Sequence, residues 1–91
     1  MAVKNHVGLI AVATAATSTN SAVINAKSIS WIANHSATNA ITFNFEEGTD
    51  TSGAFMVGTG AIVTNIDIPV NTIYYDCTGA SATFSLFGIA R

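Results

Sequence analysis

The sequence predicts an all-β fold, a single β-sandwich or jelly roll of about seven to eight short antiparallel strands. Three observations favour it. β-branched and aromatic residues recur with period two, turns rich in Gly and Asn separate these runs, and no window sustains the apolar period of an amphipathic helix. The chain has 91 residues, and a second core would need roughly 50 more. We therefore expect one β domain over residues 1–91, with residues 1–20 as either a strand of that domain or an extended arm.

The N-terminal segment is expected to be part of the fold rather than a signal peptide. Lys4 precedes an apolar run, as in a signal peptide, but this run, at residues 7–13, is short and is interrupted by a glycine. We predict a strand over residues 2–12, a flexible or extended connector over 13–20 and a short strand at 23–24.

The clearest strand signal lies at residues 40–45 (AITFNF), where apolar and polar side chains alternate. Residues 27–33 (KSISWIA) alternate in the same way. This alternation would place Ile29, Trp31 and Ala33 on one face. The intervening sequence, NHSATN, is rich in residues that hydrogen-bond to their own backbone in turns. We therefore predict that these two strands pair as a hairpin.

Four further strands are expected in the C-terminal half of the chain. They lie at residues 54–57, 61–68, 72–77 and 82–89. Pro69 should end the second of them, because proline lacks the amide donor that a strand ladder needs. In the last one the alternation shifts after Leu86, which indicates a bulge or burial on both faces.

The surface is predicted to be poor in charge. Only 9% of the residues are Asp, Glu, Lys or Arg, whereas a soluble domain usually carries about 25%. These few side chains cannot cover a folded surface of roughly 5,000 Å². Small neutral residues must fill most of that surface, so it can pack against copies of itself without desolvating charges. We therefore predict a homo-oligomer, and a monomer with a neutral skin of Thr, Ser and Asn is the alternative.

Two groups of residues are candidates for contacts with other molecules. The first comprises apolar residues of the N-terminal segment, which we predict to touch other subunits: Val3, Val7, Leu9, Ile10 and Val12. The second comprises Trp31, Tyr74 and Tyr75, whose rings could anchor an interface or stack on a ligand such as a sugar. Because Tyr74 and Tyr75 are adjacent in a predicted strand, at most one of them should point into the core.

The charge balance argues against two classes of partner. The net charge is −2, and the only cations are Lys4, Lys27 and Arg91. Without a basic patch the chain cannot neutralise a run of phosphates, so we expect no nucleic acid as a partner. We expect no membrane partner for the same reason, and no apolar run approaches the length of a membrane span.

No catalytic, cofactor-binding or metal-binding residues are predicted, and we expect no enzyme. A hydrolase needs a nucleophile beside a base, paired acids or a metal. His6 and His35 are the only histidines, and the single Cys77 reads as a small buried residue. Residues 46–53 form an acidic loop that could supply oxygen ligands to calcium, but they lack the spacing of an EF-hand. A plain loop in solvent is the simpler interpretation.

The overall texture of two stretches, ISWIANHSATNAITFNF and AIVTNIDIPVNTIYYDCTGASATFSLFGIA, resembles the small, charge-poor β-sandwich virion proteins of tailed bacteriophages, such as head decoration or cement proteins. The resemblance implies a structural protein that decorates or cements a capsid or tail surface in symmetric copies. Its partners would be copies of itself and a major capsid or tail protein. It would be made in the host cytoplasm and end in the virion.

The alternative function is a carbohydrate- or receptor-binding β module of a fibre or adhesin. It would use Trp31 or a tyrosine together with the acidic loop. A subunit of a pilus or of a self-assembling fibre is also open.

Overall fold

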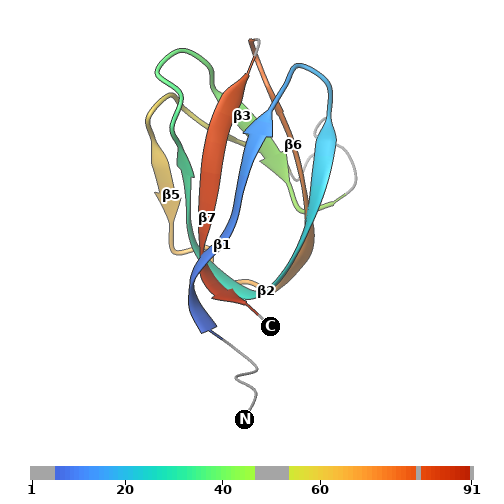
Figure 1. The fold of residues 1–91 in the computed structure, drawn as a ribbon, viewed down its shortest axis with the longest axis vertical. Helices are drawn as coiled ribbons and strands as arrows, with labels where there is room; N and C mark the ends of the chain where they lie inside the picture. The colour runs from blue at the N-terminus through green and yellow to red at the C-terminus, as the bar shows by residue number, and fades with distance from the viewer. Residues whose placement is uncertain (1–5, 47–53, 80, 91) are drawn as a thin grey trace.

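The fold is all-β, as predicted. The computed structural model describes residues 6–46, 54–79 and 81–90, and within these ranges all the regular structure is strand. The strands are β1 (His6–Ala15), β2 (Asn20–Asn34), β3 (Ile41–Asn44), β4 (Phe55–Val57), β5 (Ile62–Thr64), β6 (Val70–Cys77) and β7 (Ala82–Ala90). Figure 1 shows their arrangement. The strand predicted at residues 2–12 overlaps β1 at residues 6–12, and residues 2–5 lie outside the described residues.

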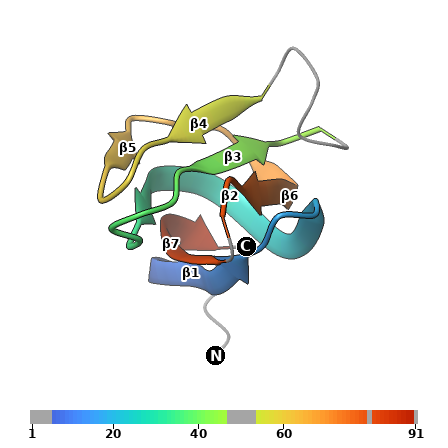
Figure 2. The same ribbon diagram turned by 90° about the horizontal axis from the view of Figure 1, so that it is seen from above.

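The strands form one antiparallel sheet that folds over into two layers. The order is β1-β7-β2-β6-β3-β4, and β5 also pairs with β2. Figure 2 shows β1 and β7 in one layer, which we call the first, and β3 and β4 in the other, which we call the second, with β2 passing between them. The first half of β2 pairs with β6, and its second half pairs with β7 and β5. The result is a small β-sandwich-like domain.

β2 can serve both layers because it is bent by bulges. The register shifts between Val23 and Ala26 opposite β6, and again after Ala26 and after Ile29 opposite β7. At each shift β2 has one residue more than its partner strand. Asn25 lies at the first shift with a φ of 47°. An extra residue on one strand bends that strand and increases its twist, so three of them turn β2 from one layer into the other.

The bulges also overturn the predicted face of residues 27–33. Ile29 is fully buried in the core, whereas Trp31 lies on the outer face, in register with Phe87. The prediction that Ile29 and Trp31 share a face is wrong because an extra residue, Ser30, lies between them and reverses the alternation.

The predicted hairpin between residues 27–33 and 40–45 is also wrong. β3 pairs with β4 and β6, not with β2. The reason is that both edges of β2 are already occupied at this end: Trp31, Ile32 and Ala33 pair with β7 on one side and with β5 on the other. The chain therefore leaves β2 and crosses to the other layer.

The strand predicted at residues 61–68 is shorter than expected and ends at Thr64. Asn65 and Asp67 have φ values of 60° and 49°, in the left-handed region that interrupts a strand. The segment nevertheless follows β2, because the amides of Asn65 and Asp67 donate to the carbonyls of Ser30 and Ile29 at 3.1 and 2.9 Å. β5, this segment and β6 thus run along β2 as one interrupted strand.

The core lies between the layers and is centred on Phe84 of β7. Its ring meets Phe43 of β3 and Tyr75 of β6 edge to face, at centroid distances of 4.8 and 4.7 Å. Other large buried side chains are Ile29, Ile32, Ile41, Ile73, Leu86 and Val57. Burial of each such side chain is worth about 1.5–3 kcal/mol. Phe84, Ser85 and Leu86 are all buried in succession, which confirms the burial on both faces predicted for the last strand.

Gly88 is where β7 passes closest to the bulged strand. A Cβ atom on Gly88 would overlap the carbonyl oxygen of Ser28 and lie 2.9 Å from the Cα of Ile29. Both contacts are with backbone, so no side-chain rotation can relieve them. The absence of a side chain at position 88 lets β2 bulge against β7.

We expect Gly88→Ala to lower the free energy of unfolding by about 1–3 kcal/mol or more, because the methyl group overpacks a backbone contact. Gly8→Ala is a matched control. Gly8 is the register partner of Gly88 on β1, and a Cβ there has nothing within 4 Å. Urea denaturation of both variants measures the difference, and equal effects would refute this explanation of the glycine.

Candidate functional site

The candidate site is the outer face of β7, the second half of β2 and β5. Register partners in antiparallel strands point their side chains to the same side of the sheet. Two such rows cross this face: Phe87, Trp31 and Thr64, and next to them Ser85, Ala33 and Ile62. We call these six residues the outer face. Ala33 and Ser85 are only 4% and 5% exposed, so the other four residues form its accessible surface. None of them carries a charge.

An aromatic pair lies at the centre of the outer face. The rings of Trp31 and Phe87 stack with centroids 5.2 Å apart and planes only 4° from parallel. Both side chains are half-buried, so the pair presents apolar surface to the outside. Ile62, on the neighbouring row, is 60% exposed. Trp31, the first predicted aromatic anchor, therefore belongs to an uncharged, partly exposed surface rather than to the core.

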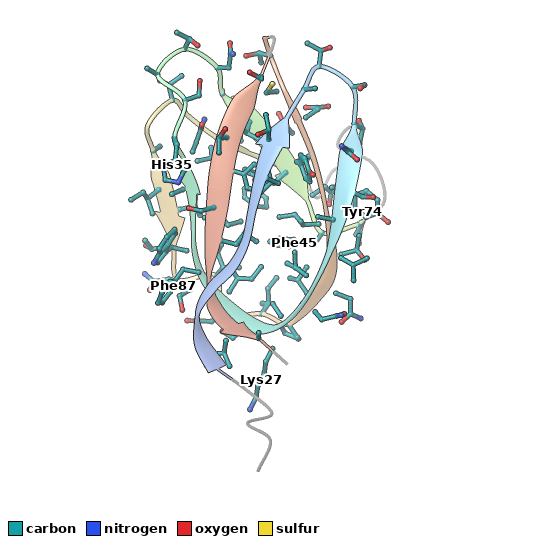
Figure 3. All side chains as sticks on the ribbon, in the orientation of Figure 1. Lys27, His35, Phe45, Tyr74 and Phe87 are labelled. Carbon is teal, nitrogen blue, oxygen red and sulfur yellow. The ribbon has the colours of Figure 1, made fainter. Side chains whose placement is uncertain are left out.

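His35 and Ser85 form a contact that the sequence did not indicate. The Nε2 atom of His35 lies 2.8 Å from the Oγ of Ser85, and the amide of His35 donates to the carbonyl of Thr83 at 2.9 Å. The pairing of β7 with the end of β2 brings the two residues together across 50 positions of sequence. Figure 3 shows His35 and Phe87 on the same side of the molecule.

A serine hydroxyl beside an imidazole is the first requirement of a nucleophile and its base. However, Ser85 is only 5% exposed, and no pocket is found in the described part of the chain where a substrate could bind. The contact satisfies a buried hydroxyl and ties the residue that follows β2 to β7. We assign it that structural role.

The two tyrosines have opposite surroundings, as the sequence predicted. Tyr75 is 4% exposed and contacts Phe43 and Phe84 in the core, so it cannot anchor a partner. Tyr74 is half-buried and points to the other side of β6. It belongs to the outer side of the second layer, away from Trp31.

The predicted N-terminal contact residues lie on an edge strand. Val7, Leu9, Ile10 and Val12 belong to β1, which pairs only with β7 among the described strands. Ile10 is the extra residue at the register shift between Leu9 and Ala11. Val3 lies outside the described residues.

No metal site is found in the parts of the chain that the structure describes, which contain no group of three or more His, Cys, Asp or Glu side chains able to hold an ion. Glu46 is exposed, and the rest of the predicted acidic loop lies outside the described residues. Cys77 is buried and free, as predicted, with its Sγ 3.4 Å from the carbonyl oxygen of Ala15.

Within the described residues no helix is long and apolar enough to cross a membrane. Comparison with protein families, curated proteins and solved structures finds no match to this chain.

Burial gives Tyr75 a pH-dependent effect on stability. Desolvation raises the pKa of Tyr75 above its ordinary value of 10.0, so the folded state holds the phenol proton more tightly than the unfolded chain does. The stabilisation that the protonated Tyr75 gives to the folded state is therefore complete below pH 10, and it is lost as the pH rises through the pKa of Tyr75 in the folded protein.

We expect the free energy of unfolding to fall above about pH 10 and the fall to be smaller in Tyr75→Phe, which has no phenol to ionise. Denaturant midpoints of both proteins at a series of alkaline pH values measure this loss of stability. Tyr74→Phe is the matched control, because it leaves Tyr75 in place and should keep the alkaline loss. An unchanged profile in Tyr75→Phe would contradict the prediction.

Proposed function

We propose that this protein is a structural component of a virion, which decorates or cements a phage capsid or tail surface as a symmetric homo-oligomer. The observation that supports it most is the outer face, with its stacked Trp31 and Phe87 and its exposed Ile62. A structural role needs no catalytic residues.

The distribution of charge supports contact of the outer face with another protein. β1, β5 and β7 contain no charged residue. The charged side chains that the structure describes are Lys27, Glu46, Asp67 and Asp76. Asp76 lies on β6 and Glu46 follows β3, both in the second layer, whereas Lys27 and Asp67 lie at the bend of β2. The part of the sheet formed by β1, β7, the second half of β2 and β5 can therefore be covered without desolvating an ion, a step that costs several kcal/mol per charge.

The composition of the outer face also fits an interface. Aromatic residues are enriched and charged residues are depleted in the fully buried centre of protein interfaces. A parallel Trp31–Phe87 pair with a neighbouring isoleucine gives such a centre, and the exposed Thr64 adds a neutral polar side chain. The partner that we propose for this face is a major capsid or tail protein.

The experiment is sedimentation of the purified protein with particles of the phage that encodes it, assembled without it. We expect saturable binding in a symmetric copy number. Ile62→Lys should weaken binding by at least about tenfold, because it buries an unpaired ammonium at the outer face. Val23→Lys is the matched control: Val23 is 73% exposed and pairs with Thr72 in the second layer, so this variant should bind like the wild type.

Failure of the wild-type protein to bind the particles would refute the virion role. Equal binding by Ile62→Lys and the wild type would refute the outer face as the contact surface. Circular dichroism of both lysine variants checks that the sandwich is folded, which we expect because each replaced side chain is largely exposed.

A second candidate is a carbohydrate- or receptor-binding module, favoured by the exposed part of the Trp31–Phe87 pair. Flat aromatic surfaces stack on sugars. A glycan array with the wild type, Trp31→Ala and Tyr74→Ala distinguishes the two functions. The virion role predicts no glycan binding by any of the three proteins. Binding that is lost in Trp31→Ala and kept in Tyr74→Ala would favour the module instead.

A further inference from the structure

β1 is a long strand with one open edge. It lies at the end of the sheet order and pairs only with β7 among the described strands. Its length is 10 residues, whereas β4 and β5, which also have an open edge, have 3 residues each. β2 pairs with β7 only from residue 26 onward, and β6 pairs with β3 only from residue 74 onward, so shorter stretches of these two strands are open as well. In an antiparallel ladder about half of the residues point their amide and carbonyl groups away from a given neighbour. Several donors and acceptors of β1 therefore face outward.

The sequence of β1 has little of the usual protection of an edge. Natural sheets keep edge strands short, or place charges, prolines or bulges on them to prevent pairing with other chains. The sequence HVGLIAVATA contains neither a charged residue nor a proline, and it has one register shift, between Leu9 and Ala11. An uncharged edge of this length with a single bulge remains a template for another strand.

The edge is also held in place. β1 makes nine register pairs with β7. Its last residue, Ala15, is fully buried, and the carbonyl of Ala16 accepts from the amide of Cys77 at 2.8 Å. A partner strand would meet a backbone that is already extended and fixed, which reduces the conformational entropy lost on pairing.

We propose that β1 pairs antiparallel with β1 of a second copy of this chain about a two-fold axis. The partner strand must be uncharged, free of proline and about as long, with an open edge of its own. Among the described strands only β1 has an uncharged open edge of this length, because β4 and β5 have 3 residues each and the open stretches of β2 and β6 are shorter than β1. A two-fold axis matches each outward donor of one copy with an acceptor of the other, so the contact closes on itself. Pairing of β1 with the short β4 or β5 would leave most of these groups unpaired.

The pairing extends the proposed function to the contact between copies. Leu9 on β1 is in register with Phe87, and Phe87 with Trp31. The two-fold axis would therefore join two sheets into one continuous layer that presents both outer faces. A single strand pair buries less than the roughly 1,200 Å² of a standard interface. The dimer in solution should accordingly be weak and dependent on concentration.

The test is a scan of single cysteines at residues 8 to 14, one at a time, under mild oxidation at high protein concentration. The native Cys77 stays in place because it is buried, and the wild type shows whether it reacts. The two copies of a residue move apart by about 7 Å for each position away from a two-fold axis, since each strand rises about 3.4 Å per residue. A disulfide forms only at Cα separations up to about 7 Å.

We therefore expect cross-linked dimer at one position or two adjacent positions and a steep fall on both sides. Thr83→Cys is the matched control. Thr83 is the exposed register partner of Thr14, but it lies on β7, inside the sheet, and should not cross-link. The pairing would be overturned if the yield of cross-linked dimer were the same at every position of β1, or if no position gave more dimer than Thr83→Cys.

Amide hydrogen exchange of the wild type tests the pairing without any substitution. Alternate amides of β1 should become protected as concentration rises, while those bonded to β7 stay protected throughout. Protection that does not change with concentration would also overturn the pairing. If the β1 dimer forms but does not bind phage particles, the pairing stands and the virion role is refuted. If the protein binds phage particles but no β1 variant cross-links, the virion role stands and the pairing is refuted.

Discussion

The structure depends on β2, a strand of 15 residues that pairs in both layers. Its residues in the hydrophobic core, Ile24, Ala26, Ile29 and Ile32, are spaced by two, three and three, where a regular strand would point every second residue into the core. The extra residues at the two shifts opposite β7 convert a spacing of two into three. Each bulge thus keeps the next isoleucine inside while the strand turns. Gly88 permits the closest of these contacts because its Cα carries no side chain that would strike the backbone of Ser28 and Ile29.

Asn34 at the end of β2 connects the two layers by hydrogen bonds. It is 2% exposed. Its side-chain amide donates to the carbonyls of Asn39, Val57 and Gly58, and its oxygen accepts from the amide of Ser36. A buried amide that satisfies several backbone groups is costly to lose, since each carbonyl left without a donor is destabilising by about 1–3 kcal/mol. This side chain holds the end of β4 and the segment before β3 close to β2, although β2 and β3 do not pair.

The sequence indicated local features well and long-range ones poorly. The strands near residues 40–45, 54–57, 72–77 and 82–89 were predictable because alternation is a property of neighbouring residues. The hairpin was not, because whether β2 pairs with β3 or with β7 and β5 depends on segments 30 to 60 positions away. The same holds for the candidate site, where β2–β7 pairing creates both the Trp31–Phe87 stack and the His35–Ser85 contact. The positive φ angles did have a signal, since Asn25, Asn65 and Asp67 are of the residue types that tolerate that region.

Two features of the first layer are unfavourable for an isolated chain, the open edge of β1 and the apolar outer face. Either could be relieved by a single substitution, a lysine on the edge or a polar residue at position 62, and neither change would disturb the core. An uncharged edge and an uncharged face in the same part of the sheet are better explained by contact of both with other protein surfaces than by coincidence. Because strand pairing at β1 would leave the outer face open, and cover of the outer face would leave β1 open, one contact cannot serve both. The two contacts that we propose, one between copies and one with a larger surface, would account for both features.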